Sequence, residues 1–432
     1  MERQRAKPTL KRGIGLFEAT VYGIGVILGA GIYVIIGPGA GLAGNAVWLS
    51  FIFAAIIASF TGLSYAELSS MHPKEAAEYV YTRKAFRRES LSFVIEWIMI
   101  VSLIIAAAAV SLGFAGYFVK IFGSEMLLIP VAVALIGILS LINFLGIKES
   151  ARFNIIATMI EFFGLVIIIV LGLSFIGSPD INYFEAPEGL PGIMGATALI
   201  FFAFIRFDEI ANISEETRNA PKTVPKALMI ALIISTILYV LVAISAVSIA
   251  GWETLSHSGA PLTDVAVHAI GPDILIIMSV IAMFATGNTV LIMLIVLSRM
   301  LYGMSNQKSL PPILSKIHNT RRTPYISVFL VMVFAMLFVT IGNIKTVATL
   351  TDIGIFIAYF FVNLSLIGVR LKSKEVKASF RSPINIGNFP ILAALGAVTC
   401  FVMFFFFEPI MLLAETAIIV LGYVVYRVIN RK

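Results

Sequence analysis

The sequence predicts an all-α integral membrane protein with about 12 transmembrane helices. Of its 432 residues, 59% are hydrophobic and only 13% are charged, and the mean hydropathy is +0.99. Soluble globular proteins carry about 25% charged residues, so the composition excludes that class. Apolar runs repeatedly reach the roughly 20 residues that a helix needs to cross a bilayer. A porin-like barrel would instead show alternating segments of about ten residues, and we find none.

Twelve spans follow from the apolar runs and from the Pro, Gly and charged residues between them. The predicted spans are 14–36, 44–70, 90–119, 126–145, 152–176, 192–214, 225–250, 272–304, 324–341, 346–370, 388–407 and 409–428. Residues 1–13 are polar and basic and form a predicted cytoplasmic tail. No short apolar core with a small-residue cleavage site follows this tail, so no removable signal peptide is expected.

The distribution of positive charge predicts the topology. With a cytoplasmic N-terminus, 28 of the 31 Lys and Arg residues lie in the termini or in the loops after spans 2, 4, 6, 8 and 10. Only Lys120 and Lys345 lie outside, and Arg206 lies within span 6. This asymmetry obeys the positive-inside rule. We therefore predict a multi-pass protein of the cytoplasmic membrane with both termini in the cytoplasm, and the net charge of +7 does not indicate nucleic-acid binding.

The inventory of reactive side chains excludes several other classes. Cys400 is the single cysteine, so no intrachain disulfide forms, and the four histidines are scattered, so no metal site is expected. The chain has no GxxxxGK[ST] loop, which leaves a primary pump unsupported. We predict no enzyme, because a nucleophile–base pair or a metal set is missing from the apolar spans.

The first span contains the glycine-rich stretch GIGVILGAGIYVIIGPG at residues 23–39. Gly25 and Gly29 have the GxxxG spacing, so close helix packing is one interpretation. The other is that Gly29, Ala30 and Gly31 unwind the helix. Unwinding frees backbone N–H and C=O groups, which must be satisfied within a membrane. A zwitterion satisfies both kinds, because N–H groups at a helix start suit a carboxylate and free carbonyls suit an ammonium group.

Spans 1 and 6 each carry glycine or polar interruptions, and they begin two sets of five spans with opposite orientation. This arrangement is what an inverted repeat requires, and interrupted helices at matching positions point to a binding site. We predict a first repeat over residues 14–176, a second over 192–370, and two additional helices over 388–428.

Several stretches resemble the amino acid–polyamine–organocation (APC) superfamily in order along nearly the whole chain. They are the break around GAGIY in span 1, YAEL at 65–68, YVYTRKAF at 79–86, FFAFIRFDEIANISEETRNAPKTVPKAL at 201–228 and SRMLYGMSNQKSLPP at 298–312. The resemblance implies a five-plus-five inverted repeat with broken helices 1 and 6 and two further helices. It also implies transport of amino acids or related amines by alternating access.

The resemblance further implies where the substrate binds. The substrate carboxylate would meet the backbone N–H groups of Ala30 and Gly31, and its amino group would meet the carbonyls of Ile27 and Ile205. Phe202 stands where the family often places an aromatic gate; the alternative is an ordinary packing residue. The predicted substrate-binding residues are Ile27, Gly29, Ala30, Gly31, Phe202, Ile205 and Arg206.

Arg206 departs from the family, which usually has glycine at this point of helix 6. A mid-membrane Arg costs about 2.5–3.5 kcal/mol on insertion scales, so it usually faces a cavity or a partner. Three alternatives stay open. Arg206 forms an ion pair with Asp208, Glu209 or Glu161; it lines the vestibule; or it reaches the site, disfavours cationic substrates and favours an acidic side chain or the substrate carboxylate.

Glu161 lies in the middle of the apolar run of span 5. An apolar environment disfavours the charged carboxylate, so Glu161 is a candidate proton carrier; the alternative is a permanent partner for Arg206. Sodium is less expected, because a charged side chain crowds the ion position that the family uses between helices 1 and 8. Thr286, Asn288 and Thr289 of span 8 either line the pathway or form interhelical hydrogen bonds.

Together these features predict a secondary active transporter that takes up neutral or acidic amino acids with protons. The alternatives are an exchanger of amino acids or amines and a receptor that binds amino acids without moving them. The expected partners are the amino acid and the lipid bilayer. No bound cofactor, no metal and no particular oligomeric state are predicted.

Overall fold

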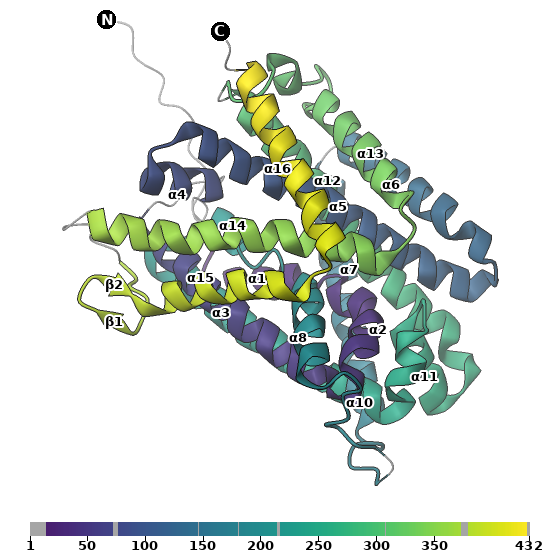
Figure 1. The fold of residues 1–432 in the computed structure, drawn as a ribbon. Helices are drawn as coiled ribbons and strands as arrows, with labels where there is room; N and C mark the ends of the chain where they lie inside the picture. Colours follow the sequence, from purple (N-terminus) through teal and green to yellow (C-terminus); the bar gives the residue numbers. More distant parts are fainter. Residues whose placement is uncertain are drawn as a thin grey trace, which may run out of the picture.

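The computed structural model describes residues 14–71, 77–145, 147–179, 181–213, 217–306, 308–372 and 379–429. The predicted tail, residues 1–13, lies outside these ranges. The chain is almost entirely helical (Figure 1). Its helices are α1 (Leu16–Leu28), α2 (Gly31–Ala43), α3 (Val47–Met71), α4 (Ala77–Phe86), α5 (Glu89–Phe122), α6 (Leu128–Leu145), α7 (Ile147–Gly172), α8 (Gly189–Ile200), α9 (Glu209–Asn212), α10 (Ala220–Ser256), α11 (Pro261–Ile270), α12 (Leu275–Asn306), α13 (Tyr325–Val339), α14 (Ile344–Lys372), α15 (Ile391–Met403) and α16 (Pro409–Ile429).

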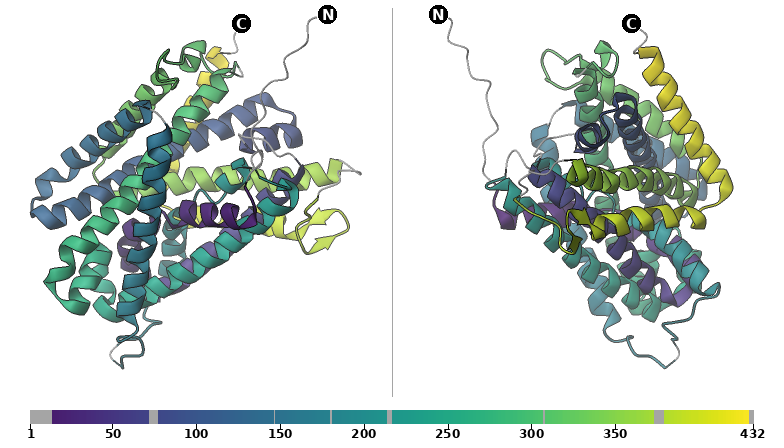
Figure 2. Two further views of the ribbon diagram at one scale, coloured as in Figure 1. Left: turned by 180° about the vertical axis from the view of Figure 1, so that it is seen from behind. Right: turned by 60° about the vertical axis from the view of Figure 1, so that its left-hand side comes forward.

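The prediction of an all-α membrane fold is confirmed. Within the described residues, seven helical segments are long and apolar enough to cross a membrane, and five shorter apolar helices accompany them. Each of the twelve predicted spans overlaps one or two of the observed helices. The end of α16 and the loop between α7 and α8 lie at opposite ends of the molecule (Figures 1 and 2). We call the side that carries the loops after spans 2, 4, 6, 8 and 10 the basic side, and the opposite one the far side.

Burial distinguishes central helices from peripheral ones. The most apolar window of α5 is 89% buried inside the protein, whereas that of α16 is only 11% buried. Helix α5 therefore runs through the core and packs against α12 and α14, while α16 lies on the outside and leaves apolar side chains for lipid. Seen from behind, α1 lies beside the long α10 (Figure 2).

Three elements were not predicted from the apolar runs. Helices α4 and α11 connect spans, and each has only ten residues, too few to cross a bilayer. A two-stranded hairpin pairs β1 (Asn385–Ile386) with β2 (Phe389–Pro390) before α15. A positive φ of 59° at Gly387 makes its tight turn, a conformation that glycine adopts without strain.

The first predicted span is broken as expected, but it is longer than expected. Helix α1 ends at Leu28, and α2 begins at Gly31 and continues through Pro38 to Ala43, beyond the predicted end at residue 36. Membrane helices tolerate an internal proline because neighbouring groups satisfy the freed backbone. The glycine beside it serves packing, since a Cβ on Gly37 would lie 2.7 Å from the Leu255 carbonyl oxygen.

The sixth predicted span is also broken, which confirms the second interrupted helix. Helix α8 ends at Ile200, a 3-10 turn covers Phe201–Ala203, and α9 begins only at Glu209. Between them Arg206 has a φ of +78°, which is unusual for a residue with a Cβ. The repeat boundaries 14–176 and 192–370 and the separate pair 388–428 stay predictions.

The two breaks touch each other at Gly31 and Ala203. A Cβ on Gly31 would lie 2.4 Å from the Ala203 Cα and 2.8 Å from its Cβ, closer than real Cβ atoms come. Glycine is therefore needed here for the approach of two backbones, and not for helix unwinding alone. The GxxxG interpretation applies in part, because a Cβ on Gly25 would lie 3.0 Å from the Thr158 side chain in α7.

We predict that Gly31→Ala destabilises the protein, because the added methyl group forces the two breaks apart. Overpacking of this kind costs about 1–3 kcal/mol. Thermal denaturation of the detergent-solubilised protein should show a lower Tm. Gly195→Ala in α8 is the matched control, since nothing lies within 4 Å of its new Cβ. Equal Tm values for the two variants would contradict the prediction.

Candidate functional site

The two helix breaks line one small cavity, which we call the central pocket. All seven predicted substrate-binding residues line it, together with Thr289 of α12. Its volume is about 10 Å³. That is about the space of one water molecule, so an amino acid enters only if the surrounding helices move apart. The structure thus brings the predicted site residues together, and their roles in binding stay predictions.

The freed backbone N–H group of helix 1 has a side-chain partner. The Ala30 N–H donates to Thr289 Oγ1 over 2.9 Å, and the Thr289 hydroxyl donates in turn to the Ala285 carbonyl over 3.0 Å. A substrate carboxylate that binds the Ala30 N–H therefore has to displace Thr289. Thr286 instead donates to the Ala282 carbonyl of its own helix, and neither Thr286 nor the buried Asn288 lines the central pocket.

The freed carbonyls meet Tyr239, a residue that the sequence analysis missed. Its hydroxyl lies 2.5 Å from the Ile27 carbonyl oxygen, 2.9 Å from that of Leu28 and 3.1 Å from that of Ala203. One hydroxyl proton thus serves three acceptors from both breaks. Tyr239 lies in the apolar run of span 7, and a polar group at that depth needs a partner, which was the available signal.

Arg206 forms an ion pair with Glu209. The guanidinium Nε lies 2.6 Å from Glu209 Oε1, and Nη2 lies 2.9 Å from Oε2, with both side chains buried. Asp208 instead accepts a 2.6 Å hydrogen bond from the Tyr359 hydroxyl. Of the alternatives left open by the sequence, the structure therefore favours the pair with Glu209, three residues along the chain. Its charge is balanced locally, although Arg206 still lines the central pocket.

A second small cavity lies on the other side of Arg206. Its volume is about 20 Å³, and its lining includes Arg206, Glu209, Asp208 and Glu78. Arg206 lines both this cavity and the central pocket, so the Arg206–Glu209 pair stands between them.

Glu161 is fully buried in α7 but does not line the central pocket. In the part of the chain that the structure describes, neither of its carboxylate oxygens has a hydrogen-bond partner. The pairing with Arg206 is thus not formed here. The backbone carbonyl of Glu161 accepts a 2.8 Å hydrogen bond from the Tyr33 hydroxyl, which links it to the first turn of α2.

Two further buried acids escaped the sequence analysis. Asp352 of α14 and Glu415 of α16 are 0% and 1% exposed; the Phe202 backbone is a partner for Asp352, and among the described residues the Glu415 carboxylate has no hydrogen-bond partner. The signal was present, because each is an acid inside a predicted span, and intramembrane acids are generally functional.

On the basic side, ionic and backbone contacts join segments that are distant in the sequence. Glu67 and Arg370 form a buried ion pair, with Nε 2.7 Å from Oε1, and the Ser382 N–H donates to Glu67 over 2.8 Å. Next to α1, the Arg218 N–H donates to the Ile14 carbonyl over 2.8 Å. This bond joins the segment before α1 to the segment after α9.

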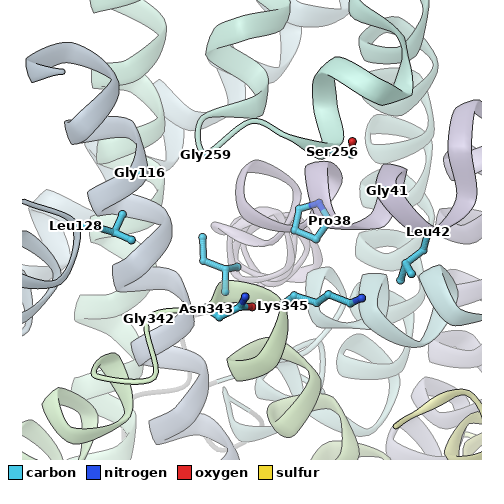
Figure 3. Close-up of a pocket in the computed structure, with 11 residues that line it drawn as sticks. Pro38, Gly41, Leu42, Gly116, Leu128, Ser256, Gly259, Gly342, Asn343 and Lys345 are labelled. Atoms are coloured by element: carbon cyan, nitrogen blue, oxygen red, sulfur yellow. The ribbon is translucent and has the colours of Figure 1, made fainter. Parts of the chain in front are cut away.

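The far side is hollowed. A hollow of about 400 Å³ lies there, lined in part by α2 (Figure 3). A neighbouring hollow of about 200 Å³ is lined by residues of α2 and α8. Compared with the cavity of about 20 Å³ toward the basic side, the far side offers much more space. Among the cavities given by the described residues, the larger ones therefore lie on the far side.

Helix α4 carries a titratable carboxyl, that of Glu78, on the basic side. The Tyr65 hydroxyl donates to Glu78 Oε1 over 2.6 Å. Burial raises the pKa of the Glu78 carboxyl to about 7, with repulsion by Glu96 adding to the rise, while hydrogen bonds involving Tyr65 and Asp208 oppose it. Because this pKa is raised, the protonated Glu78 carboxyl stabilises the fold at low pH, and its contribution to stability is lost as the pH rises through about 7.

We therefore predict that α4 is held more weakly at pH 8 than at pH 6. Hydrogen–deuterium exchange of the α4 amides, corrected for the intrinsic pH dependence, should show more frequent opening at pH 8. Glu78→Gln should remove most of this difference, because the amide does not titrate. The same pH trend in the variant as in the wild type would contradict the assignment to Glu78.

A second prediction concerns the Arg206–Glu209 pair. Glu209→Gln leaves a buried guanidinium without its counter-charge, which costs about 3–5 kcal/mol and should lower the Tm. The double variant Arg206→Gly/Glu209→Gln should recover part of this loss, because no unpaired charge remains and glycine suits the φ of +78°.

The control for this prediction is the exposed pair of Arg83 and Glu89, whose side chains are 56% and 57% exposed. Glu89→Gln should change the stability by less than about 1 kcal/mol. A Tm for Glu209→Gln as high as that for Glu89→Gln would show that the buried pair is not needed for stability.

Comparison with known proteins identifies the family. A family model described as amino acid permease matches residues 14–428. The branched-chain amino acid permease BcaP of Bacillus subtilis is 29% identical, over 98% of this chain and 94% of the relative. The methylthioribose transporter of the same organism is 29% identical, over 100% of this chain and 96% of the relative. The cationic amino acid transporter 4 of Mus musculus is 27% identical, over 88% of this chain and 63% of the relative. The chain is therefore a multi-pass membrane protein that belongs to the amino acid permease family.

Proposed function

We propose that this protein is a secondary active transporter that moves amino acids across the cytoplasmic membrane by alternating access. The observation that carries the proposal is the central pocket, where two broken helices meet between a hollowed far side and a basic side joined by a buried ion pair. The freed backbone groups there already have exchangeable partners in Thr289 and Tyr239. The positive-inside rule supports cytoplasmic termini, with the far side outside. The proposal that the protein transports amino acids and is not an enzyme agrees with its membership of the amino acid permease family.

The proposed substrate is an amino acid with a neutral side chain. Apart from Arg206, the central pocket is lined by backbone, a threonine and apolar side chains such as Phe202, Ile205 and Met293. Glu209 neutralises Arg206, so neither an acidic nor a cationic side chain finds a free counter-charge. The similarity to a branched-chain amino acid permease supports this choice. An acidic substrate is the second candidate, and it requires Arg206 to leave Glu209.

Proton coupling through Glu161 is the proposed driving mechanism. A buried carboxyl without a hydrogen-bond partner among the described residues is most stable when protonated, because burial disfavours the charge. The Glu161 backbone carbonyl accepts a hydrogen bond from the Tyr33 hydroxyl, so the turn of α7 that carries this carboxyl is joined to α2. Sodium coupling is less favoured, and exchange of amino acids is the alternative mechanism.

The test is uptake of radiolabelled amino acids by proteoliposomes with and without an inward proton gradient. We expect gradient-driven accumulation of neutral amino acids, because the gradient protonates Glu161 from outside. Glu161→Gln should abolish accumulation but keep exchange between internal and external amino acid, since the amide mimics the protonated form.

Glu415→Gln is the matched control, because Glu415 is another buried acid without a partner in the described chain but lies in the peripheral α16. It should transport like the wild type. Accumulation by Glu161→Gln would contradict the proton role. Flux that needs internal amino acid and ignores the gradient would identify an exchanger, and binding without any flux would identify a receptor.

A further inference from the structure

The far side carries two cationic side chains in very different settings. Lys120 Nζ lies 2.6 Å from the Asp264 carboxylate, so its charge is balanced. Lys345 is exposed at the start of α14, and among the described residues no carboxylate lies within ion-pair distance of it. Among the described residues, Lys345 is therefore the far-side lysine without an ion-pair partner, on a side whose loops carry mostly acids.

Lys345 lines the larger hollow, which we call the outer hollow (Figure 3). The outer hollow has a volume of about 400 Å³. That lies within the usual range of about 300–1,000 Å³ for small-ligand sites. Lys345 is the charged residue of its lining, and Asn343 and Ser256 add polar groups. Figure 3 shows the Lys345 side chain extending below Pro38 toward Leu42 of α2.

The outer hollow and the central pocket are both lined by helix α2. Gly31 at the start of α2 lines the central pocket, and Pro38, seven residues later, lines the outer hollow. At 1.5 Å per residue, the two sites are about 10 Å apart along the helix. Lys345 also lines the neighbouring hollow of about 200 Å³, together with Leu199 of α8, so it lies beside both outer half-helices.

The local field around Lys345 favours an anion. Helix α14 begins at Ile344, and the positive end of its dipole has the same sign as the lysine. Asn343 caps this end, with its Oδ1 accepting from the Thr346 N–H over 3.0 Å. Lys345 shares the smaller hollow with Glu188 and Glu408, whereas it is the charged residue in the described lining of the outer hollow.

We propose that the outer hollow is an entry site that holds the carboxylate of the transported amino acid against Lys345 before it moves along α2 to the central pocket. This inference rests on the proposed transport of amino acids. The amino acid is a zwitterion without net charge, so Lys345 acts on its carboxylate at close range within the outer hollow and not by long-range attraction. Lys345 thus acts on capture of the substrate and not on the conformational change.

The experiment measures initial uptake rates in right-side-out vesicles for Lys345→Arg, Lys345→Gln and Lys345→Glu. We expect KM to rise by roughly threefold to tenfold in Lys345→Gln, with an unchanged maximal rate. Lys345→Glu should raise KM further, and Lys345→Arg should match the wild type. The differences should shrink at about 1 M salt, where the Debye length falls to about 3 Å. Lys120→Gln is the control: it changes the net charge of the far side equally but should keep the wild-type KM, because Lys120 does not line the outer hollow.

Three results would overturn the proposal. They are an unchanged KM in Lys345→Gln and Lys345→Glu, an equal rise in Lys120→Gln, and a lower maximal rate with an unchanged KM. Lys345 is exposed, so these variants should fold, and equal Tm values check this. Absence of amino acid uptake by the wild type would count against the proposed function itself, which separates the two failures.

Discussion

A helix can stop in the middle of a bilayer only where its freed backbone groups find partners inside the protein. In this chain the constraint is met because the break between α1 and α2 lies against the break between α8 and α9. Gly31 lets the start of α2 approach Ala203 in the second break, at a distance that no Cβ would allow. Tyr239 then reaches carbonyls of both breaks, and Thr289 satisfies the Ala30 N–H group. The remaining architecture places α10 and α12 so that these two side chains reach the breaks.

The partners of the breaks are side chains, and this has a consequence for transport. A hydroxyl that accepts or donates one bond can be replaced by a carboxylate or an ammonium group without leaving a buried polar group unsatisfied. A closed pocket of about 10 Å³ and a substrate-filled pocket can therefore both be stable. Had α1 and α2 formed one continuous helix, the same groups would be bonded within the helix and would be unable to recognise a ligand.

Charge inside the protein is arranged to limit its cost. Arg206 is buried and has a strained φ, yet its bidentate contact with Glu209 compensates for lost hydration. The same pair separates the central pocket from the cavity toward the basic side and removes free charge from the pocket. Under the proposed transport function, this balanced charge favours neutral substrates. On the far side, by contrast, Lys345 lies in solvent and keeps its charge available.

The sequence by itself determined the twelve spans, their predicted orientation and the position of both helix breaks. These features depend on local hydropathy, on the placement of Lys and Arg, and on clusters of glycine and polar residues, all of which are visible along the chain. Seven of the residues that line the central pocket were also named from the sequence, through the family resemblance, whereas Val26, Val110, Ala203 and Met293 were not. Asp352 was equally visible as an acid within a span and was overlooked.

Only the tertiary structure decided which groups face each other. Three carboxylates were candidate partners for Arg206, and the backbone turn before α9 selected Glu209. Thr286 and Thr289 differ by three residues, yet only Thr289 contacts the break, since helix rotation sets which side chain faces inward. Tyr239 meets Ile27 across 212 positions of the chain. Such contacts depend on how whole helices pack, and a single sequence carries no local signal of that packing.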